Sequence, residues 1–319
     1  MYYIGVDLGG TNIAAGVVNE SFEIIAKGSV PTLAEHEGEL IVRDMAKLVG
    51  DLIEKCSLKL SDVASVGIAT PGSVDLENEL IVYANNLNFK DFPIVKCFKK
   101  YLPIEKVYIE NDANAAALAE SLVGAAKGTK SSVMVTLGTG VGGGIIINNK
   151  IYSGINYAAG ELGHMVIEHN GRLCSCGRRG CWEAYSSATA LVNMTKEKLA
   201  QCEALNIKTS MQEEFEKIGR VNARIAFNAQ KSGDKAGCEV IKEYLDYLAC
   251  GITNLINIFQ PEVLSIGGGI CGEGDNLLLP ILSLTENEQY SRNSEKKTEI
   301  KLAKLGNDAG IIGAAGLGM

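Results

Sequence analysis

The chain has 319 residues, of which 46% are hydrophobic and 21% are charged, and its formal net charge is −8. This length suffices for about two domains with sizeable cores. The acidic balance and the lack of a basic run exclude nucleic-acid binding through phosphate contacts, and no apolar stretch is long enough to span a membrane.

The first predicted elements are two strands, residues 2–6 and 13–18, separated by a glycine-rich turn. Since a strand begins within the first residues, we expect no targeting segment and a cytoplasmic location. The turn begins with Asp7, and a carboxylate beside phosphate-binding amides is typical of a Mg²⁺ site. The alternative interpretation is a turn aspartate that accepts hydrogen bonds from its own backbone. The other residues of interest in the turn are Gly9, Gly10, Thr11 and Asn12.

Helices and strands alternate in the next part of the chain. Apolar residues at helical spacing predict a helix over residues 39–56, and buried strands are predicted over residues 64–69 and 106–109. A further helix is expected over residues 112–120, because this stretch is rich in alanine, the residue with the highest helix propensity.

Asp112 is the candidate catalytic residue, in the sequence Glu110-Asn111-Asp112 between the second of these strands and the helix. One interpretation is a simple helix N-cap. The other is that Asn111 and Asp112 offer an amide and a carboxylate to a substrate hydroxyl. A carboxylate in that position can accept the hydroxyl proton as the oxygen attacks a phosphoryl group.

A second strand, glycine turn and strand are predicted over residues 133–137, 138–144 and 145–147. Gly138, Gly140 and Gly143 satisfy the pattern G-x-G-x-x-G, but a dinucleotide-binding site requires a helix directly after the glycines. A strand follows instead, which argues against a dehydrogenase. Backbone amides at such a hairpin tip can bind an anion, and the repeated design indicates a duplicated architecture.

The cysteine cluster within residues 164–181 is the most specific feature of the sequence. Three thiolates and one imidazole form a closed tetrahedral set that is typical of structural Zn²⁺. The predicted ligands are His164, Cys174, Cys176 and Cys181, with His169 as an alternative imidazole. The other six cysteines are expected to be reduced core residues. Glu161 and Glu183 flank the cluster, which indicates a rigid polar pocket.

The last third of the chain is mainly helical. Helices are predicted over residues 183–202, 222–231, 238–259 and 309–317, and strands over residues 263–266 and 300–305. The first of these strands leads into Gly267-Gly268-Gly269. Three glycine-rich turns at strand ends together favour a nucleoside triphosphate as ligand.

These motifs resemble those of the ROK sugar kinases (repressors, open reading frames, kinases), within the actin-like, sugar kinase and heat-shock ATPase fold. The resemblance runs in order from residue 7 to 269, and the segment Gly160-Glu161-Leu162-Gly163-His164 with the cysteine cluster is its most specific part. Within the family the chain looks most like the bacterial glucokinases. The other matching segments are residues 7–12, 70–72, 110–116, 137–144 and 266–269.

The resemblance implies an α/β chain with a two-domain actin-like/hexokinase (ribonuclease H-like) ATPase fold and an interdomain cleft where ATP and sugar meet. The expected N-terminal domain is residues 1–118, joined by the C-terminal helix near 303–319, and the second domain is residues 119–302. It also implies an ATP-dependent kinase that phosphorylates a hexose, above all glucose at the 6-hydroxyl, and that forms a homodimer.

The resemblance assigns roles to residues as well. Asp112 matches the general base, and Gly72 lies in a matching segment near the sugar. The positions that match sugar contacts are Asn86, Asn111, Glu161, His164 and Glu183. The positions that match ATP and Mg²⁺ contacts are Asp7, Gly9, Gly10, Thr11, Asn12, Gly138, Thr139, Gly140, Gly267 and Gly268. The structural Zn²⁺ ligands carry over as His164, Cys174, Cys176 and Cys181.

The chain departs from the family pattern after Asn86, where Leu87-Asn88-Phe89 replaces the glycine and tryptophan of many members. The sugar is therefore open, and the alternatives are fructose, another hexose or an N-acetylated amino sugar such as N-acetylglucosamine or N-acetylmannosamine. A non-catalytic sugar sensor is the alternative outside the enzymes. Repressor members carry a DNA-binding domain before the first strand, which we do not expect here.

Overall fold

The structure is a computed structural model, and it describes residues 1–84 and 87–319. The chain forms two compact units. Unit 1 consists of Met1–Met134, Gly144–Gly160 and Ala303–Met319, and unit 2 consists of Val135–Gly143 and Glu161–Leu302.

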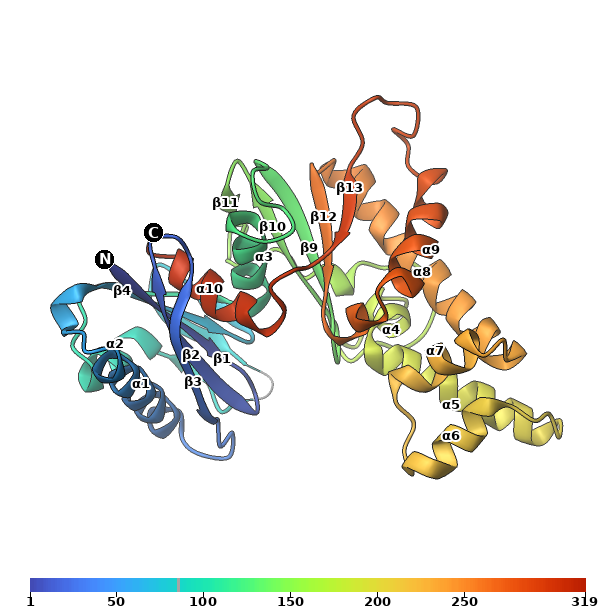
Figure 1. Ribbon diagram of the computed structural model, residues 1–319, viewed down its shortest axis with the longest axis horizontal. Helices are drawn as coiled ribbons and strands as arrows, with labels where there is room; N and C mark the ends of the chain where they lie inside the picture. Colours follow the sequence, from blue (N-terminus) through green and yellow to red (C-terminus); the bar gives the residue numbers. More distant parts are fainter. Residues whose placement is uncertain (85–86) are drawn as a thin grey trace. The chain divides into compact units, whose positions relative to one another are not determined.

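Unit 1 is built on a five-stranded sheet with the order β3-β2-β1-β4-β8. β1 pairs antiparallel with β2 and parallel with β4, and β4 pairs parallel with β8. Helices α1 and α2 pack on one face of this sheet, while α10 packs on the other face together with α3 (Figure 1). The bounds are β1 Tyr2–Leu8, β2 Asn12–Asn19, β3 Ile24–Pro31, β4 Val63–Thr70, β8 Val107–Asn111, α1 Gly38–Lys55, α2 Ile94–Tyr101, α3 Asp112–Leu122 and α10 Ala309–Gly316.

The period of two along β1 explains how one strand serves both faces of the sheet. Ile4 and Val6 are fully buried in the core beneath α1 and α2. Gly5 points to the opposite face, where a Cβ atom would overlap the backbone carbonyl of Ile311 in α10. Likewise, a Cβ atom on Gly67 in β4 would overlap the backbone carbonyl of Ala314 in α10. Glycine at these positions lets the backbone of α10 lie directly on the sheet.

Gly313 makes the corresponding close approach between helices, since its Cβ would overlap the carbonyl oxygen of Ala115 in α3. We expect Gly313→Ala to lower the free energy of unfolding by about 1–3 kcal/mol, because backbone atoms on both sides cannot move aside cheaply. The matched control is Gly50→Ala, also inside a helix but with no atom within 4 Å of its added Cβ. That change should raise stability by about 0.5–1 kcal/mol. Urea or thermal unfolding of both variants checks the pair, and equal effects would contradict this account.

Unit 1 also contains a small three-stranded sheet with the order β5-β6-β7. Its strands are antiparallel to one another, and they follow the end of β4. The bounds are β5 Ser73–Asp75, β6 Leu80–Tyr83 and β7 Lys90–Phe92.

The second large sheet has the order β11-β10-β9-β12-β13. In chain order this is third, second, first, fourth and fifth strand, which is also the order of the first sheet, so the predicted duplication of the architecture is confirmed. The pairing of β10 with β11 is antiparallel and that of β12 with β13 is parallel. The bounds are β9 Ser131–Leu137, β10 Val141–Ile147, β11 Lys150–Ile151, β12 Val263–Gly267 and β13 Glu299–Leu302.

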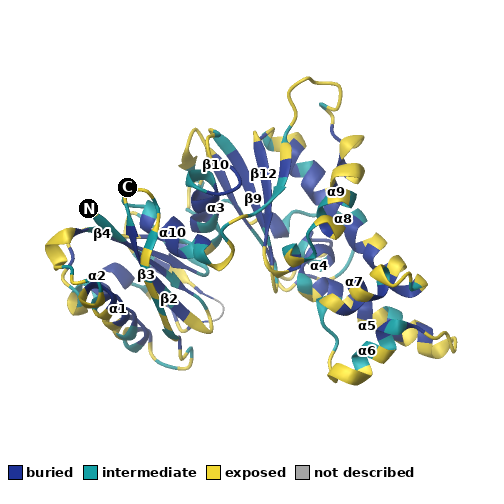
Figure 2. Ribbon diagram, viewed as in Figure 1, coloured by how far each residue is buried: buried dark blue, intermediate teal, exposed yellow. Residues whose placement is uncertain are grey.

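Unit 2 also contains six helices, α4 to α9. Figure 2 shows that α5 to α9 each have buried and exposed sides. Trp182, fully buried, packs against α8 where Gly251 leaves room for its ring, and its indole N–H donates to the carbonyl of Tyr247 at 3.0 Å. The bounds are α4 Glu183–Ser186, α5 Ala188–Ala204, α6 Ser210–Ile218, α7 Ala223–Lys231, α8 Lys235–Phe259 and α9 Asp275–Glu286. Short 3₁₀ turns cover Leu60–Asp62, Leu162–His164, Gly269–Glu273 and Gly306–Asp308.

The expectation of a turn over all of residues 138–144 is wrong, because β10 already begins at Val141. The turn is confined to residues 138–140. Gly144 lies inside the strand, and a Cβ atom there would collide with Ala117 and with the carbonyl of Ala113 in α3. The glycine therefore serves close helix–strand packing rather than a turn.

Two other predicted elements differ from the structure. The helix expected over residues 183–202 is two helices, because Ser187 adopts an extended conformation and its Oγ caps α5 by accepting the amide of Ala190 at 3.0 Å. The strand expected over residues 300–305 ends at Leu302. The amides of Lys304 and Leu305 donate instead to the buried carboxylate of Glu120, each at 2.8 Å.

None of the helices in the described parts of the chain combines the length and the apolar character needed to cross a membrane.

Candidate active site

The first glycine turn lies in unit 1, between β1 and β2, and its conformation is fixed by backbone contacts. The amide of Gly9 donates to the carbonyl of Asn12 at 3.0 Å, and the hydroxyl of Thr32 donates to the carbonyl of Gly9 at 2.6 Å. Gly10 and Thr11 are exposed at the tip. The turn therefore presents residues that the sequence predicts to bind phosphate.

Asp7 stands at the end of β1, before this turn. Burial of its carboxyl group, together with the negative charge of Asp112, raises its pKa to about 6. Gly310 in α10 leaves the space that the carboxylate fills, since a Cβ there would overlap it. Two carboxylates that repel each other are a fitting place for a cation, and hydrated Mg²⁺ prefers such oxygen ligands.

The raised pKa of Asp7 makes its ionisation unfavourable to folding. The folded pKa lies above the unfolded value of about 3.9, so the folded state holds more protons and stability falls as the pH rises between about 4 and 7. We expect Asp7→Asn to be more stable than the natural protein at pH 8, by at most about 3 kcal/mol, and equally stable near pH 4.

Thermal unfolding without Mg²⁺ or nucleotide measures this difference. A variant that is less stable than the natural protein at pH 8 would contradict the expectation. The same change should abolish Mg²⁺-dependent turnover, so stability and activity should move in opposite directions.

Asn111 and Asp112 lie in unit 1 where β8 meets α3. Asn111 is the N-cap, and its Oδ1 accepts the amides of Ala113 at 2.9 Å and Asn114 at 3.2 Å. The interpretation of Asp112 as the N-cap is therefore wrong. Asp112 is the first residue of the helix, and its Oδ1 accepts the amide of Ala113 at 2.8 Å.

The structure also joins Gly72 to this group. The Nδ2 of Asn111 donates to the carbonyl of Gly72 at 3.1 Å. Gly72 has a φ of +88°, which only glycine adopts readily, and a Cβ would overlap the backbone of Tyr83. Three of the predicted site residues, Gly72, Asn111 and Asp112, are thus neighbours in unit 1.

Glu110 has no role predicted from the sequence, but its carboxylate holds Asn111 and Asn114 in position. Its Oε1 accepts the amide of Asn111 at 2.9 Å and the side chain of Asn114 at 3.1 Å. Burial raises the pKa of Glu110. A glutamate at a strand end directly before Asn-Asp is the signal that could have drawn attention to it.

The second glycine turn, residues 138–140, belongs to unit 2. The amide of Gly138 donates to the carbonyl of Gly140 at 3.0 Å. The start of α5 holds the turn from outside, because Ala188 donates its amide to the carbonyl of Gly138 at 2.9 Å and Thr189 donates its hydroxyl to the carbonyl of Thr139 at 2.7 Å.

The four predicted metal ligands converge in unit 2, and their ligand atoms all lie within 4.8 Å of one another. The Nδ1 of His164 is 3.7 Å from the Sγ of Cys174, and the Sγ atoms of Cys176 and Cys181 are also 3.7 Å apart. Ligands of a tetrahedral Zn²⁺ ion lie about 3.5–3.8 Å from each other. Donor chemistry and spacing therefore both fit Zn²⁺. His169, the alternative imidazole, is outside the group found among the described residues.

Glu161 and Glu183 lie beside this group. Glu161 precedes the short turn that carries His164, and its carbonyl accepts the amide of His164 at 3.1 Å. The Oε1 of Glu183 accepts the hydroxyl of Ser175 at 3.1 Å. Since Nδ1 of His164 faces the thiols, its Nε2 is the nitrogen left for a hydroxyl of a ligand.

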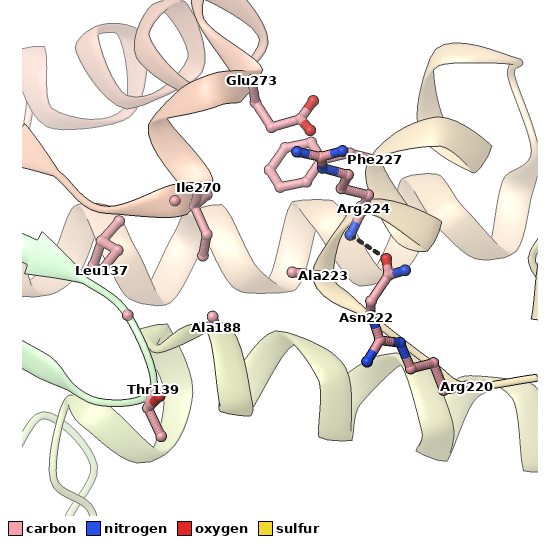
Figure 3. A pocket seen from close by; sticks show the side chains of 12 residues that line it. Leu137, Thr139, Ala188, Arg220, Asn222, Ala223, Arg224, Phe227, Ile270 and Glu273 are labelled. Atoms are coloured by element: carbon pink, nitrogen blue, oxygen red, sulfur yellow. Dashed lines mark hydrogen bonds between the residues drawn. The ribbon is translucent and has the colours of Figure 1, made fainter. Parts of the chain in front are cut away.

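A pocket of about 470 Å³ opens in unit 2 next to the second glycine turn. Gly138 and Thr139 line it on one side, and Gly268, whose Cβ would overlap the carbonyl of Leu137, holds the loop after β12 against the end of β9. Figure 3 shows α7 and the loop after β12 forming the other walls. The lining residues are Leu137, Gly138, Thr139, Ala188, Arg220, Asn222, Ala223, Arg224, Phe227, Gly269, Ile270 and Glu273.

Asn86 is the one predicted sugar contact on which the structure gives no information, because it lies outside the described residues 1–84 and 87–319.

The sequence model that describes the ROK family matches residues 3–318 of this chain. The chain belongs to the ROK family. The glucokinase of Halalkalibacterium halodurans is 35% identical over 99% of this chain and 94% of its own. The xylose repressor of Bacillus subtilis is 29% identical over 99% of this chain and 76% of its own.

Among solved structures, a ROK family glucokinase from Streptomyces griseus in complex with glucose and AMPPNP superposes with a TM-score of 0.81. It is 33% identical, and the match covers 99% of both chains. The predicted fold class of this ROK protein is thereby confirmed, and the comparisons support a sugar phosphotransferase.

Several pocket residues of this ROK protein were not expected from its sequence. Asn222 caps α7 by accepting the amide of Arg224 at 2.9 Å (Figure 3), while Phe227 and Glu273 come from α7 and from the turn after β12. Asn222 is the first residue of the helix predicted over residues 222–231, but in the structure it is the N-cap, a position that asparagine favours. Nothing in the sequence shows that this cap borders a pocket.

Proposed function

We propose that this ROK protein transfers the γ-phosphoryl group of ATP to a hexose, with glucose at its 6-hydroxyl as the preferred acceptor. One observation carries the proposal. Glu183, the carboxylate that is proposed to bind sugar hydroxyls, accepts the backbone amide of Val141, which directly follows the second glycine turn, at 3.0 Å. Groups suited to a sugar and groups suited to a phosphate are therefore direct neighbours within unit 2.

The pocket supports a nucleotide as the phosphoryl donor. One wall is the glycine turn, whose amides suit phosphate oxygens. The opposite wall includes Phe227 and Ile270, both buried, which suit the flat apolar faces of a base. A volume of about 470 Å³ lies in the range of small-molecule sites.

Asp112 is proposed to act as the general base. Its carboxylate accepts the proton of the sugar hydroxyl while that oxygen attacks the γ-phosphorus and the bond to the β,γ-bridging oxygen breaks. The amides of Thr139 and Gly140 in the second glycine turn are proposed to stabilise the negative charge that spreads over the transferred group. The orientation of the base is fixed by the hydrogen bond that the Ala113 amide donates to the Asp112 carboxylate and by the helix cap that Asn111 makes.

The metal ions have separate roles in this proposal. Asp7 would hold Mg²⁺ through its waters, and the ion supplies charge neutralisation to the phosphates. His164, Cys174, Cys176 and Cys181 would hold a structural Zn²⁺, which keeps the sugar-binding side chains in position.

The sugar contacts are proposed for the groups beside the zinc ligands and in unit 1. Glu161, His164 and Glu183 would form hydrogen bonds with hydroxyls of the sugar ring. Asn86 and Asn111 would do the same. Carboxylate, amide and imidazole groups hydrogen-bond the hydroxyls of several hexoses, so the assay has to compare sugars.

A coupled assay of ADP release, with ATP, Mg²⁺ and a panel of sugars, tests the proposal. The panel holds glucose, mannose, fructose, N-acetylglucosamine and N-acetylmannosamine, and we expect the highest kcat/KM on glucose. Preferred turnover of an N-acetylated sugar would reject the assignment of glucose and keep the kinase. Sugar binding by calorimetry without any turnover would reject the kinase and favour a sensor.

A further inference from the structure

Glu183 connects two segments that are far apart in the sequence. These are the metal loop, residues 164–181, and the second glycine turn, which leads into Val141 at the start of β10. One carboxylate oxygen, Oε2, accepts the amide of Val141 at 3.0 Å. The other, Oε1, accepts the hydroxyl of Ser175 in the metal loop at 3.1 Å and lies 3.7 Å from the Sγ of Cys174.

The groups in this connection are closely packed. A Cβ atom on Gly140 would overlap Oε2 of Glu183, and a Cβ atom on Gly163 would overlap the carbonyl oxygen of Val141. Val141 thus contacts Glu183 through its N–H, while its C=O lies against the segment before His164. A displacement of the metal loop would therefore shift Val141 through these two contacts.

The remaining contacts of the turn come from a rigid element. Ala188 and Thr189, at the start of α5, bind the carbonyls of Gly138 and Thr139. The turn is therefore held at two places: by α5 on one side and by Glu183, itself oriented by the metal loop, on the other.

We propose that Glu183 is a positioning residue for the nucleotide, so that metal in the cysteine site sets the affinity for ADP or ATP even when no sugar is present. Metal binding orders the loop that carries Cys174 and Ser175. The ordered loop fixes Glu183. By accepting the N–H of Val141, Glu183 fixes the end of the turn that carries the amides of Thr139 and Gly140. Amides that are preorganised bind an anion more tightly than amides that must first be ordered.

This role is compatible with a sugar contact of the same side chain. An ionised carboxylate has about four acceptor positions, and the described contacts with Val141, Ser175 and Cys174 leave capacity for a hydroxyl. The inference rests on the proposed function, because it takes residues 138–140 as the phosphate-binding turn.

The test is a cycle of ADP titrations by calorimetry, in the presence of Mg²⁺ and the absence of sugar. The natural protein and Glu183→Ala are each measured with zinc bound and after zinc removal, with the metal content checked by elemental analysis. In the natural protein, zinc removal should raise the Kd for ADP by about 5- to 10-fold. In Glu183→Ala, the Kd should already be raised and zinc removal should change it less than about twofold.

Equal effects of zinc removal in both proteins would overturn the proposal, as would tighter ADP binding by Glu183→Ala. Absence of ADP binding to the zinc-loaded natural protein would instead overturn the proposed donor site. The two failures are therefore distinguishable.

Circular dichroism would detect unfolding of the metal-free protein. If that protein unfolds, a second pair of variants tests the proposal. Ser175→Ala removes the hydroxyl that orients Glu183 but leaves every predicted zinc ligand in place, and it should raise the Kd for ADP about two- to fivefold. Leu173→Ala is the control, because Leu173 is exposed in the same loop and forms no hydrogen bond with Glu183 in the described parts of the chain. An effect of Ser175→Ala no larger than that of Leu173→Ala would overturn the proposal.

Discussion

Asp112→Asn is expected to lower kcat by a factor of about 10² to 10⁴, because the variant lacks the carboxylate that accepts the proton of the sugar hydroxyl. The KM for the sugar should change much less, since the amide has the same shape and can still hydrogen-bond a hydroxyl. The helix should also remain intact. The Asn side chain keeps an oxygen for the amide of Ala113, and the cap is made by Asn111.

Steady-state kinetics with saturating ATP measures this effect, and calorimetry confirms that the variant still binds sugar. Asp51→Asn, the same chemical change at an exposed position of α1, is the control and should leave kcat unchanged. A folded Asp112→Asn protein with near-normal kcat would show that another group takes the proton.

Cys181→Ser is expected to abolish stoichiometric zinc binding and to lower kcat/KM for the sugar by at least about 100-fold. Cys181 is fully buried within the cluster, and a serine hydroxyl is a poor replacement for a thiolate ligand. Without metal, the loop that positions His164 and Glu183 loses the bonds that order it. The melting temperature should fall as well.

The matched control is Cys202→Ser, because Cys202 is also buried but lies in α5, outside the cluster. This variant should lose some stability while it keeps one zinc ion per chain and most of its activity. If Cys181→Ser retained stoichiometric zinc, Cys181 would have to be removed from the ligand set. If it lost zinc but kept full activity, the metal would have no part in sugar binding.

The sequence was most informative where one residue type has few other uses. Thiols spaced closely around glycines predict a metal site by their chemistry alone, and the structure brings all four predicted ligand atoms within 4.8 Å. The glycine turn before β2 was predictable from its neighbours, since the apolar runs over residues 2–6 and 13–18 on either side of it have the length of strands.

The sequence was misleading where local pattern and tertiary contact disagree. The glycines after Val141 look like a turn, but Gly144 is in a strand because α3 packs closely against it. The residues after Leu302 look like strand, but their amides bind the distant carboxylate of Glu120. Neither contact leaves a signal within the local sequence.

By itself, the sequence determined the order of most helices and strands and the family resemblance, and it indicated a candidate set of metal ligands. These features depend on residue chemistry and short-range spacing. Only the tertiary structure decided that Glu183 reaches Val141, 42 residues earlier in the chain, and that Asn222, Phe227 and Glu273 border one pocket. Contacts of this kind depend on how the helices pack against the sheet. Packing is a property of the whole core, and no short segment specifies it.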